Sequence, residues 1–515
     1  MNPPNLKELA EQIAIPVRHL RYLLEQMEWH IPKATVWAFG SRIKWSHRPE
    51  SDLDLAVHCD KETGRKGIPK LNDALQESDL PFNVQILDFN RLPENMQENI
   101  KKNYLVLYQP QEIPLPTGWK ETTLGEVAEI IGGFAFKGEH FSNSEGVPVI
   151  KITDIKPPYV DIDNSQRIAL EQYDKDRIKK FLLGKGDYLV AMTGATIGKV
   201  GRIASHQTAY LNQRVAKIDA LEGVADKDFC YYLVFSHNFT KFIEGFSSGS
   251  SVQQNISADD IGRYPVFLPP LAEQKVIAAI LSSFDDKIEL LRRQNKTLES
   301  IAQTIFKEWF VKFNFPGATG KMIDSELGEI PEGWRVGTVN DVIERFSITY
   351  RCDQDDLSPK GKTPILDQGS NGLYGYTERD PDFQASTENP VVVFANHTCN
   401  MWFTNYPFCA IQNIIPFRGN SEYSTFFVFY MTLGQISFIE YKGHWPDFEQ
   451  KEYVIPKPDI ADRFAEIMKP LQYKIWNDNS QIQTLLKLRD TLLPKLMKGE
   501  IRVKDTKFFI KEKVK

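Results

Sequence analysis

The sequence predicts a multidomain α+β protein: a small α/β domain, then two further α/β domains separated by an antiparallel pair of long coiled-coil helices. Three observations predict it. The chain has 515 residues, and a single domain usually contains about 100–200 residues. The region after residue 110 contains a long internal duplication. Each copy ends in a run of about 40 residues whose apolar side chains recur at helical spacing.

The duplication is marked at both ends of each copy. Gly118-Trp119 opens the first copy and Gly333-Trp334 opens the second. Pro269 and Pro456 precede the two helical runs. Because Pro456 follows Trp334 more closely than Pro269 follows Trp119, the globular part of the second copy is the shorter one. Short β-prone runs bounded by Gly, Pro, Asp and Asn predict that the globular parts are mixed but rich in strands.

Both helical runs carry a heptad pattern. Apolar residues recur at alternating spacings of four and three, which predicts one buried seam per helix. Asn295 lies on the first seam, where a polar residue can fix the pairing register at some cost in stability. The two seams bury each other most simply; the alternative is that each helix packs on its own domain. The seam residues are Ile277, Leu281, Phe284, Ile288, Leu291, Asn295, Leu298, Ala302, Ile305 and Trp309, then Phe464, Met468, Leu471, Ile475, Ile482, Leu485 and Leu492.

These patterns divide the chain into five predicted parts. Residues 1–110 precede the duplication and form a domain of their own. Residues 111–265 and 319–453 are the two globular copies. Residues 266–318 contain the first long helix, and residues 454–515 contain the second helix and a basic tail.

A short motif in the first domain indicates phosphate and metal chemistry. Gly40-Ser41 follows one β-prone run, and Asp52 and Asp54 begin the next. Alternate residues of a strand share a face, so the two carboxylates point to the same side. Such a pair can hold Mg²⁺ on a triphosphate, and a Gly-Ser turn lets backbone amides approach the phosphates. Asp52 and Asp54 are therefore the candidate catalytic and metal-binding residues, and Gly40 and Ser41 the candidate nucleotide-binding residues.

This Gly-Ser…Asp-x-Asp pattern resembles the minimal nucleotidyltransferases of the DNA polymerase β superfamily. The resemblance implies a nucleotidyltransferase-like domain that binds ATP and Mg²⁺ and, if active, transfers AMP onto a protein. It also implies a third carboxylate on a later strand, where this chain has Gln85. An amide cannot act as a general base, and Asp88 faces the other side of a regular strand. Three interpretations stay open: a catalytic domain, a binding or regulatory module, and a vestigial domain.

Several short motifs are spread over residues 111–503. Together they resemble the DNA specificity subunits of type I restriction-modification systems. The motifs are Gly118-Trp119-Lys120, Leu124-Gly125, Gly194-Ala-Thr-Ile-Gly198-Lys199-Val-Gly201, Asn212-Gln213, Gly249-Ser-Ser-Val-Gln-Gln-Asn-Ile-Ser257, Leu268-Pro269-Pro270-Leu271-Ala272-Glu273-Gln274 and Leu488-Arg489-Asp490-Thr-Leu-Leu-Pro494-Lys495-Leu496-Met497-Lys498-Gly499-Glu500-Ile501.

The resemblance implies that each globular copy is a target-recognition domain reading one half of a split site in double-stranded DNA. It implies that the helix pair acts as a ruler, that two methyltransferase (M) subunits dock on it, and that restriction (R) subunits join them. S-adenosylmethionine, ATP and Mg²⁺ are then used by the partner subunits, and DNA recognition itself needs no cofactor. A helix of about 40 residues is about 60 Å long, enough to separate two domains by one or more DNA turns.

The two copies differ in their loops, which predicts an asymmetric DNA target. In the first copy a glycine-rich loop ends at Gly198 and is followed by Lys199 and Arg202, which can meet phosphate. Alternatively, its glycines only shape a tight turn. The second copy lacks this loop and has Asn371 and Tyr374 in a segment similar to one subset of these domains. The candidate DNA-binding residues are therefore Lys199, Arg202, Asn371 and Tyr374.

Composition favours a cytoplasmic protein. The net charge is −6, so contact with DNA depends on local basic surface rather than on overall charge. The five cysteines include no CxxC pair, which favours reduced and mostly buried thiols. The sequence shows neither an apolar run long enough for a membrane span nor a secretory apolar region, so no membrane partner is expected.

The leading hypothesis is a non-catalytic specificity subunit with residual nucleotidyltransferase activity in residues 1–110. Two other functions stay open. The chain can be an AMP-transferring nucleotidyltransferase, as enzyme or regulator, that its DNA-binding C-terminal region targets. It can also be a protein-interaction scaffold without a role on DNA.

Overall fold

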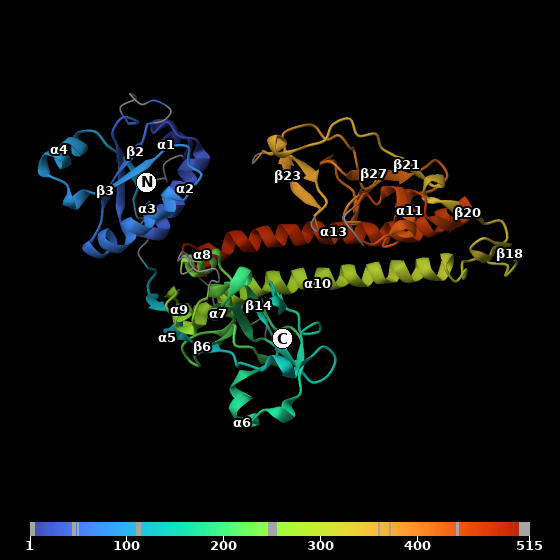
Figure 1. The fold of residues 1–515 in the computed structure, drawn as a ribbon, viewed down its shortest axis with the longest axis horizontal. Coiled ribbons are helices and arrows are strands. Elements are labelled where there is room, and N and C mark those ends of the chain that lie inside the picture. The colour runs from blue at the N-terminus through green and yellow to red at the C-terminus, as the bar shows by residue number, and fades with distance from the viewer. Residues whose placement is uncertain are drawn as a thin grey trace. The chain divides into compact units, whose positions relative to one another are not determined.

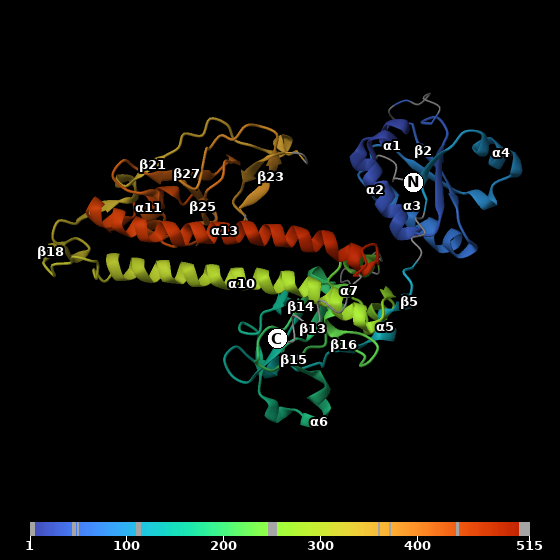
Figure 2. The same ribbon diagram turned by 180° about the vertical axis from the view of Figure 1, so that it is seen from behind.

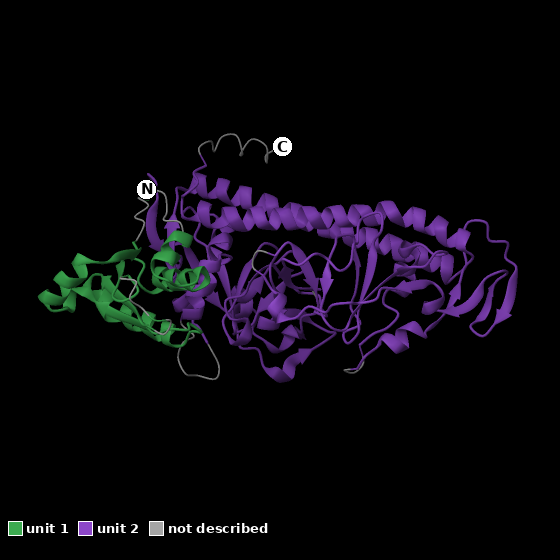
Figure 3. Cartoon of the chain, turned by 90° about the horizontal axis from the view of Figure 1, so that it is seen from above, with its two compact units in different colours: residues 1–115 green, residues 116–515 purple. Residues whose placement is uncertain are grey.

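The chain divides into two compact units, residues 1–115 and residues 116–515 (Figure 3). The computed structural model describes residues 6–43, 48, 51–109, 115–245, 255–358, 361–369, 372–438 and 442–503. The division lies close to the predicted boundary after residue 110. Within the described ranges, no helix is both long and apolar enough to cross a membrane.

Unit 1 is a mixed sheet with helices on both faces (Figure 1). Its elements are α1 (Leu6–Gln12), α2 (Val17–His30), β1 (Thr35–Phe39), β2 (Leu53–His58), α3 (Ile68–Gln76), β3 (Val84–Asp88), α4 (Glu94–Lys102) and β4 (Leu105–Tyr108). The strand order is β3-β2-β1-β4, with β2 and β3 parallel and the other neighbours antiparallel. Alternation along β2 buries Leu55 in the main core with α1, α2 and α3, and turns Ala56 toward Ile100 of α4 on the opposite face.

The duplication is visible in the secondary structure of unit 2. β5 (Lys120–Thr123) pairs with β17 (Pro265–Leu268), and β20 (Arg335–Thr338) pairs with β28 (Glu452–Ile455), both antiparallel. β5 and β20 each begin immediately after the tryptophan that opens their copy, and β17 and β28 each end immediately before Pro269 or Pro456. The sequence markers at both ends of each copy therefore relate equivalent strands.

The globular part of the first copy consists of two sheets and short helices. Its strands are β6 (Ala128–Gly132), β7 (Phe141–Ser142), β8 (Val147–Ile150), β9 (Ile155–Lys156), β10 (Tyr159–Val160), β11 (Arg167–Ile168), β12 (Leu182–Leu183), β13 (Tyr188–Ala191), β14 (Val200–Arg202), β15 (Ala209–Leu211) and β16 (Val215–Ala220). Its helices are α5 (Leu124–Val127), α6 (Lys175–Ile178), α7 (Lys227–Val234), α8 (His237–Gly245) and α9 (Ala258–Gly262). The sheet orders are β6-β16-β13-β14-β10-β9 and β12-β15-β8-β11-β7.

The second copy has smaller sheets. Its strands are β18 (Met322–Ser325), β19 (Gly328–Pro331), β21 (Ile343–Arg345), β22 (Thr363–Leu366), β23 (Leu373–Thr377), β24 (Val391–Ala395), β25 (Met401–Thr404), β26 (Cys409–Ala410) and β27 (Ile414–Gly419), and its helices are α11 (Thr425–Thr432) and α12 (Trp445–Glu449). The sheet orders are β21-β27-β24-β25 and β23-β22-β26, and β18 pairs with β19. Fully buried β24 and apolar α11 supply the core of this part.

Two long helices, α10 (Leu271–Phe310) and α13 (Pro458–Met497), lie side by side and run in opposite directions (Figures 1 and 2). Each contains 40 residues, and the register that superposes Pro269 on Pro456 also superposes their first and last residues. Ile288 and Leu291 pack against Ile482 near the middle of the pair. Asn295 Nδ2 donates a hydrogen bond to Asn479 Oδ1 at 2.9 Å. In the described residues the two helices therefore pack on each other, and the alternative, in which each helix packs only on its own domain, is wrong.

The two globular parts of unit 2 lie at opposite ends of this helix pair. Near the start of α10, Asp285 accepts a hydrogen bond from Tyr232 of α7 at 2.7 Å. Near the end of α10, Phe310 lies 5.1 Å from Phe427 of α11 and 5.1 Å from Phe464 of α13, between ring centroids. A polar contact thus holds the first domain near the start of α10, and aromatic packing holds the second domain near its end.

Candidate functional site

The predicted Gly-Ser turn and the carboxylate of Asp54 come together at the end of β1. Gly40 has a φ of +86°, and a Cβ atom built on it would lie 2.0 Å from Asp54 Oδ2. The carboxylate of Asp54 therefore lies directly against the backbone of Gly40, and only glycine fits there. Ser41 follows in the same turn.

The electrostatics of this site come from two carboxylates at alternate positions, Asp52 and Asp54. Asp52 is exposed immediately before β2, and Asp54 is half-buried as the second residue of that strand. Burial, and then the negative charge of Asp52, raise the pKa of Asp54 above its ordinary value. A cation between the two carboxylates would relieve this repulsion. Asp52 and Asp54 are therefore the residues that could hold Mg²⁺.

The strand register gives the position of the missing third carboxylate. Gln85 is the direct partner of Asp54 across the parallel pair β2–β3, and it is exposed. Asp88 pairs with Val57, whose side chain belongs to the core on the opposite face. Its carboxylate instead accepts a hydrogen bond from the backbone of Asn90 at 3.1 Å. An amide thus stands beside the paired aspartates, and no nearby acid of β3 replaces it.

Lys199 ends a tight turn in the first globular part of unit 2. Gly194 and Gly198 both have positive φ, and Gly198 lies against Ile243 of α8, 3.4 Å from its added Cβ position. Hydrogen bonds of 2.9 Å from Gly198 to Ala191, and from Ala191 to Lys199, close the β13–β14 hairpin. The glycines therefore shape the turn, and Lys199 is left exposed at its end.

Arg202 is a packing residue of the same domain. Its guanidinium carbon lies 5.9 Å from the centre of the Tyr188 ring, and the side chain is half-buried. Burial lowers the pKa of Arg202, but Tyr188, Asp228 and Asp286 of α10 outweigh burial and raise it. Because the carboxylates of Asp228 and Asp286 already compensate its charge, the placement disfavours the predicted contact between Arg202 and DNA phosphate.

In the second globular part, Tyr374 is half-buried on β23 and packs against a cluster of Cys352, Ile365 and Cys409. Asn371, the other residue predicted here, lies outside the described residues. The structure therefore gives Tyr374 a fixed position on one face of the β22–β23 hairpin.

Sequence reasoning missed a junction between the helices and the first domain. Asp285 of α10 accepts hydrogen bonds from Arg489 of α13 and from Tyr232 of α7, at 2.6 and 2.7 Å. Arg489 also lies over the ring of Phe235 at 5.0 Å. Asp285 is off the predicted apolar seam, so heptad spacing alone gave no signal for it.

Two known families match this chain. The family described as "Type I restriction modification DNA specificity domain" matches residues 116–300. The family described as "Polymerase beta, Nucleotidyltransferase" matches residues 30–113. The second match includes Gly40, Asp52, Asp54 and Gln85.

Curated relatives are of the same two kinds. The MjaIX specificity subunit of a type I restriction enzyme from Methanocaldococcus jannaschii is 26% identical over 424 residues, which cover 76% of this chain and 95% of that protein. The EcoBI specificity subunit from Escherichia coli is 28% identical over 242 residues, 44% of this chain and 46% of that protein. The probable protein adenylyltransferase MntA from Haemophilus influenzae is 36% identical over 103 residues, 20% of this chain and 84% of that protein.

A solved structure is also similar. The type I restriction-modification S subunit from M. genitalium aligns with a TM-score of 0.49 and 17% identity, covering 75% of this chain and 97% of that one. The two family matches divide the sequence at the same place as the two compact units. The chain therefore carries a type I restriction-modification DNA specificity domain, and a polymerase β-type nucleotidyltransferase domain precedes it.

Proposed function

We propose that this chain gives a type I restriction-modification complex its DNA specificity by holding two unlike target-recognition domains at a fixed separation. Residues 111–265 and 319–453 are the recognition domains, and residues 266–318 and 454–515 contain the spacer helices. The observation that carries the proposal is the direct pairing of α10 with α13, with one globular part at each end. A coiled-coil spacer of this kind is about 60 Å long.

The physics of a fixed spacer explains selectivity for a split site. Two modules on one rigid body bind as one ligand, so their binding free energies combine only when both half-sites lie at the matching distance. DNA with a wrong gap engages one domain and loses the contribution of the other. Because the two domains differ in sheet order and loops, the recognised double-stranded target is asymmetric.

In the proposed complex two M subunits dock on the specificity subunit and R subunits join them in the cytoplasm. S-adenosylmethionine and ATP are used by those partners, whereas this chain needs no cofactor to recognise DNA. Lys199 is proposed to meet phosphate, and Asn371 and Tyr374 to lie at the DNA face of the second domain. Arg202 is proposed only to support the Lys199 turn, given its packing on Tyr188.

The spacer can be tested by lengthening both helices together. One heptad inserted in the middle of α10 and one at the facing point of α13 preserve the seam and add about 10 Å, or about three base pairs. We expect methylome sequencing of cells that also contain the M subunit to show the same two half-sites with a gap about three base pairs longer. A control substitution of exposed Lys296→Ala on α10 leaves the gap unchanged. An unchanged gap in the lengthened protein contradicts the spacer role.

A second candidate function rests on unit 1. Asp52 and Asp54 beside Gly40 form a site that fits Mg²⁺ and a nucleotide, and we propose that it transfers AMP onto a protein or binds nucleotide as a regulator. Bound Mg²⁺ would neutralise the triphosphate, while the Gly40-Ser41 turn orients it. Incubation of the full chain with labelled ATP and Mg²⁺ tests transfer, with Asp52→Ala as the matched variant. Absence of label on wild-type protein and its partners leaves only the binding role.

A further inference from the structure

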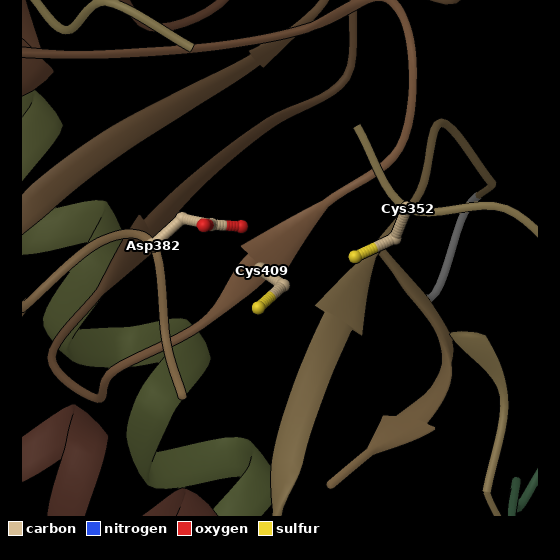
Figure 4. Close-up of side chains that lie close together, drawn as sticks. All are labelled: Cys352, Asp382 and Cys409. Atoms are coloured by element: carbon tan, nitrogen blue, oxygen red, sulfur yellow. The ribbon is translucent and has the colours of Figure 1, made fainter. Parts of the chain in front are cut away.

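Two cysteines and an aspartate from distant parts of the sequence meet in the second globular part of unit 2. The Sγ atoms of Cys352 and Cys409 and a carboxylate oxygen of Asp382 all lie within 4.8 Å of one another (Figure 4). The two cysteines are buried, at 4% and 0% exposure, and neither is in a disulfide. Such a grouping of soft and hard donors in a protein interior calls for a chemical explanation.

Backbone pairing holds Asp382 beside Cys409. Phe383 and Phe408 exchange two backbone hydrogen bonds of 3.1 Å in an antiparallel bridge. The residues that flank this bridge, Asp382 and Cys409, are therefore opposite each other and share one face. Their proximity is set by the fold and not by a chance side-chain conformation.

Backbone pairing also places Cys352. Its amide donates a hydrogen bond to the carbonyl oxygen of Ala410 at 3.0 Å, and it forms a parallel bridge with Ile411. Ile411 is two residues from Cys409 and lies on the same face of the strand, so both thiols point into one small space. Ile365 on the neighbouring β22 pairs with Cys409 and closes the apolar side of this space.

Among the described residues, one buried polar atom of the cluster lacks a hydrogen-bond partner. Asp382 Oδ2 is shielded from solvent and has no hydrogen-bond partner. The thiol of Cys409 donates a long hydrogen bond, 3.6 Å, to the carbonyl oxygen of Asp380, and it also interacts with the side chains of Asp382 and Cys352. A bound cation would compensate a buried carboxylate and allow the thiols to ionise.

We propose that Cys352, Cys409 and Asp382 bind a zinc ion. Two thiolates favour a borderline-soft cation over Mg²⁺ or Ca²⁺, and a carboxylate is also a common zinc ligand. Zinc ligands lie about 2.0–2.3 Å from the metal, so the three donor atoms need to approach one another by only about 1 Å. A fourth coordination position remains for water or for the nearby carbonyl oxygen of Asp380. This inference goes beyond the proposed specificity role and does not depend on it.

The zinc ion would tie three separate segments of the domain together. It would join the segment before β22, the segment that begins at Asp382, and β26. Tyr374 packs on the same cluster, so the metal would also support the β22–β23 hairpin. The zinc site itself does not depend on the proposed function. An effect of zinc on DNA recognition by Tyr374 does depend on it.

Metal content and metal spectroscopy of the full chain test this proposal. The protein is produced in medium that contains zinc and is purified without chelators. Its zinc content is then measured by elemental mass spectrometry, and in a second sample the zinc is replaced by Co²⁺. We expect one zinc per chain and a thiolate-to-cobalt charge-transfer band. Cys352→Ser and Cys409→Ser should lose both signals, and Asp382→Asn should weaken zinc binding by about tenfold or more. Cys399→Ser, in the same domain but outside the cluster, should behave as wild type.

A wild-type chain without zinc or without the cobalt band overturns the proposal, as does a band unchanged in both cysteine variants. If a cysteine variant fails to fold, alkylation of the wild type decides the matter. Zinc should protect Cys352 and Cys409 from iodoacetamide, as read by peptide mass spectrometry, and equal labelling with and without zinc contradicts the site. Zinc content is read without DNA, so its outcome is distinct from that of the methylome experiment.

Discussion

The guanidinium of Arg489 on α13 donates a hydrogen bond of 2.6 Å to the carboxylate of Asp285 on α10. The second oxygen of Asp285 accepts from the hydroxyl of Tyr232 in the first recognition domain at 2.7 Å. Both charged side chains are largely buried, at 8% and 14% exposure. One carboxylate therefore joins both spacer helices to a domain.

Asp285→Ala should strongly destabilise the region where the first domain meets the helices. The substitution leaves the guanidinium of Arg489 buried without its main partner, and breaking such a pair costs about 3–5 kcal/mol. Urea unfolding of the full chain, followed by hydrogen exchange in α7, α10 and α13, measures this loss. The exposed pair Arg293–Glu289, 3.1 Å apart on α10, is the control: Arg293→Ala should cost less than about 1 kcal/mol. An equal loss of stability in the two variants would contradict the conclusion that Asp285 joins the helices to the first domain.

Asn295→Leu should stabilise the helix pair. Asn295 is buried at 7% exposure, and its Oδ1 atom has no hydrogen-bond partner although Nδ2 bonds to Asn479. Leucine would remove a buried unsatisfied acceptor and extend the apolar seam, a gain of about 1 kcal/mol. The urea midpoint of helix unfolding is the measurement. A lower midpoint would mean that the Asn295–Asn479 bond outweighs the unsatisfied oxygen; Asn479→Ala, at the exposed end of the bond, gives the comparison.

Asp54→Asn should stabilise unit 1 at neutral pH. Burial, then Asp52, raise the pKa of Asp54 in the folded state above its ordinary value of 3.8. Folding therefore favours the protonated acid, so stability falls as the pH rises from about 3.8 through the raised pKa. The amide variant avoids this loss, and its advantage should shrink as the pH is lowered toward 4. Thermal melting of the full chain across this range measures it.

In the same melting experiment, added Mg²⁺ should make the wild type more stable than Asp54→Asn. It should raise the melting temperature of wild-type unit 1 and have little effect on Asp54→Asn, because the variant has lost one of the two anionic ligands. An equal effect of Mg²⁺ on both proteins would argue against a metal site at Asp52 and Asp54.

Gln85→Asp should restore nucleotide transfer if only the third carboxylate is missing. Gln85 stands directly beside Asp54 in the strand register, where an acid can serve as general base. General-base catalysis contributes about 10²–10⁴-fold, so label from ATP should increase at least about 10²-fold over wild type. The double variant Gln85→Asp with Asp52→Ala should return to background. No gain in Gln85→Asp would favour a vestigial or purely binding domain.

Local patterns predicted the long-range architecture well because the duplication supplied a register. The heptad spacing of Ile288 and Leu291 predicted a buried seam, and the register that superposes Pro269 on Pro456 relates both ends of α10 to those of α13. Alternation along a strand likewise predicted that Asp88 faces away from Gln85, and the strand register pairs Gln85 with Asp54 but Asp88 with Val57. These features depend on periodicity within one element, which a sequence displays directly.

Contacts between distant elements could not be predicted in the same way. Cys352, Asp382 and Cys409 are brought together by two isolated bridges, and their spacing contains no metal-binding motif. The sequence shows Arg202 only as a cation after a loop, whereas its surroundings include Tyr188, Asp228 and Asp286 from three different elements. Such placements depend on tertiary pairing of segments whose local sequence is ordinary.

The difference in length between the two copies lies entirely outside α10 and α13, which contain 40 residues each. Each recognition domain joins the rest through a short antiparallel strand pair, β5–β17 or β20–β28, placed equivalently in the two copies. Loops inside a recognition domain can therefore become longer or shorter, or be replaced by recombination, without altering the distance between the two recognition domains. The architecture permits new DNA preferences to evolve by exchange of whole recognition domains. The gap between the two half-sites is set separately, by the length of the helices.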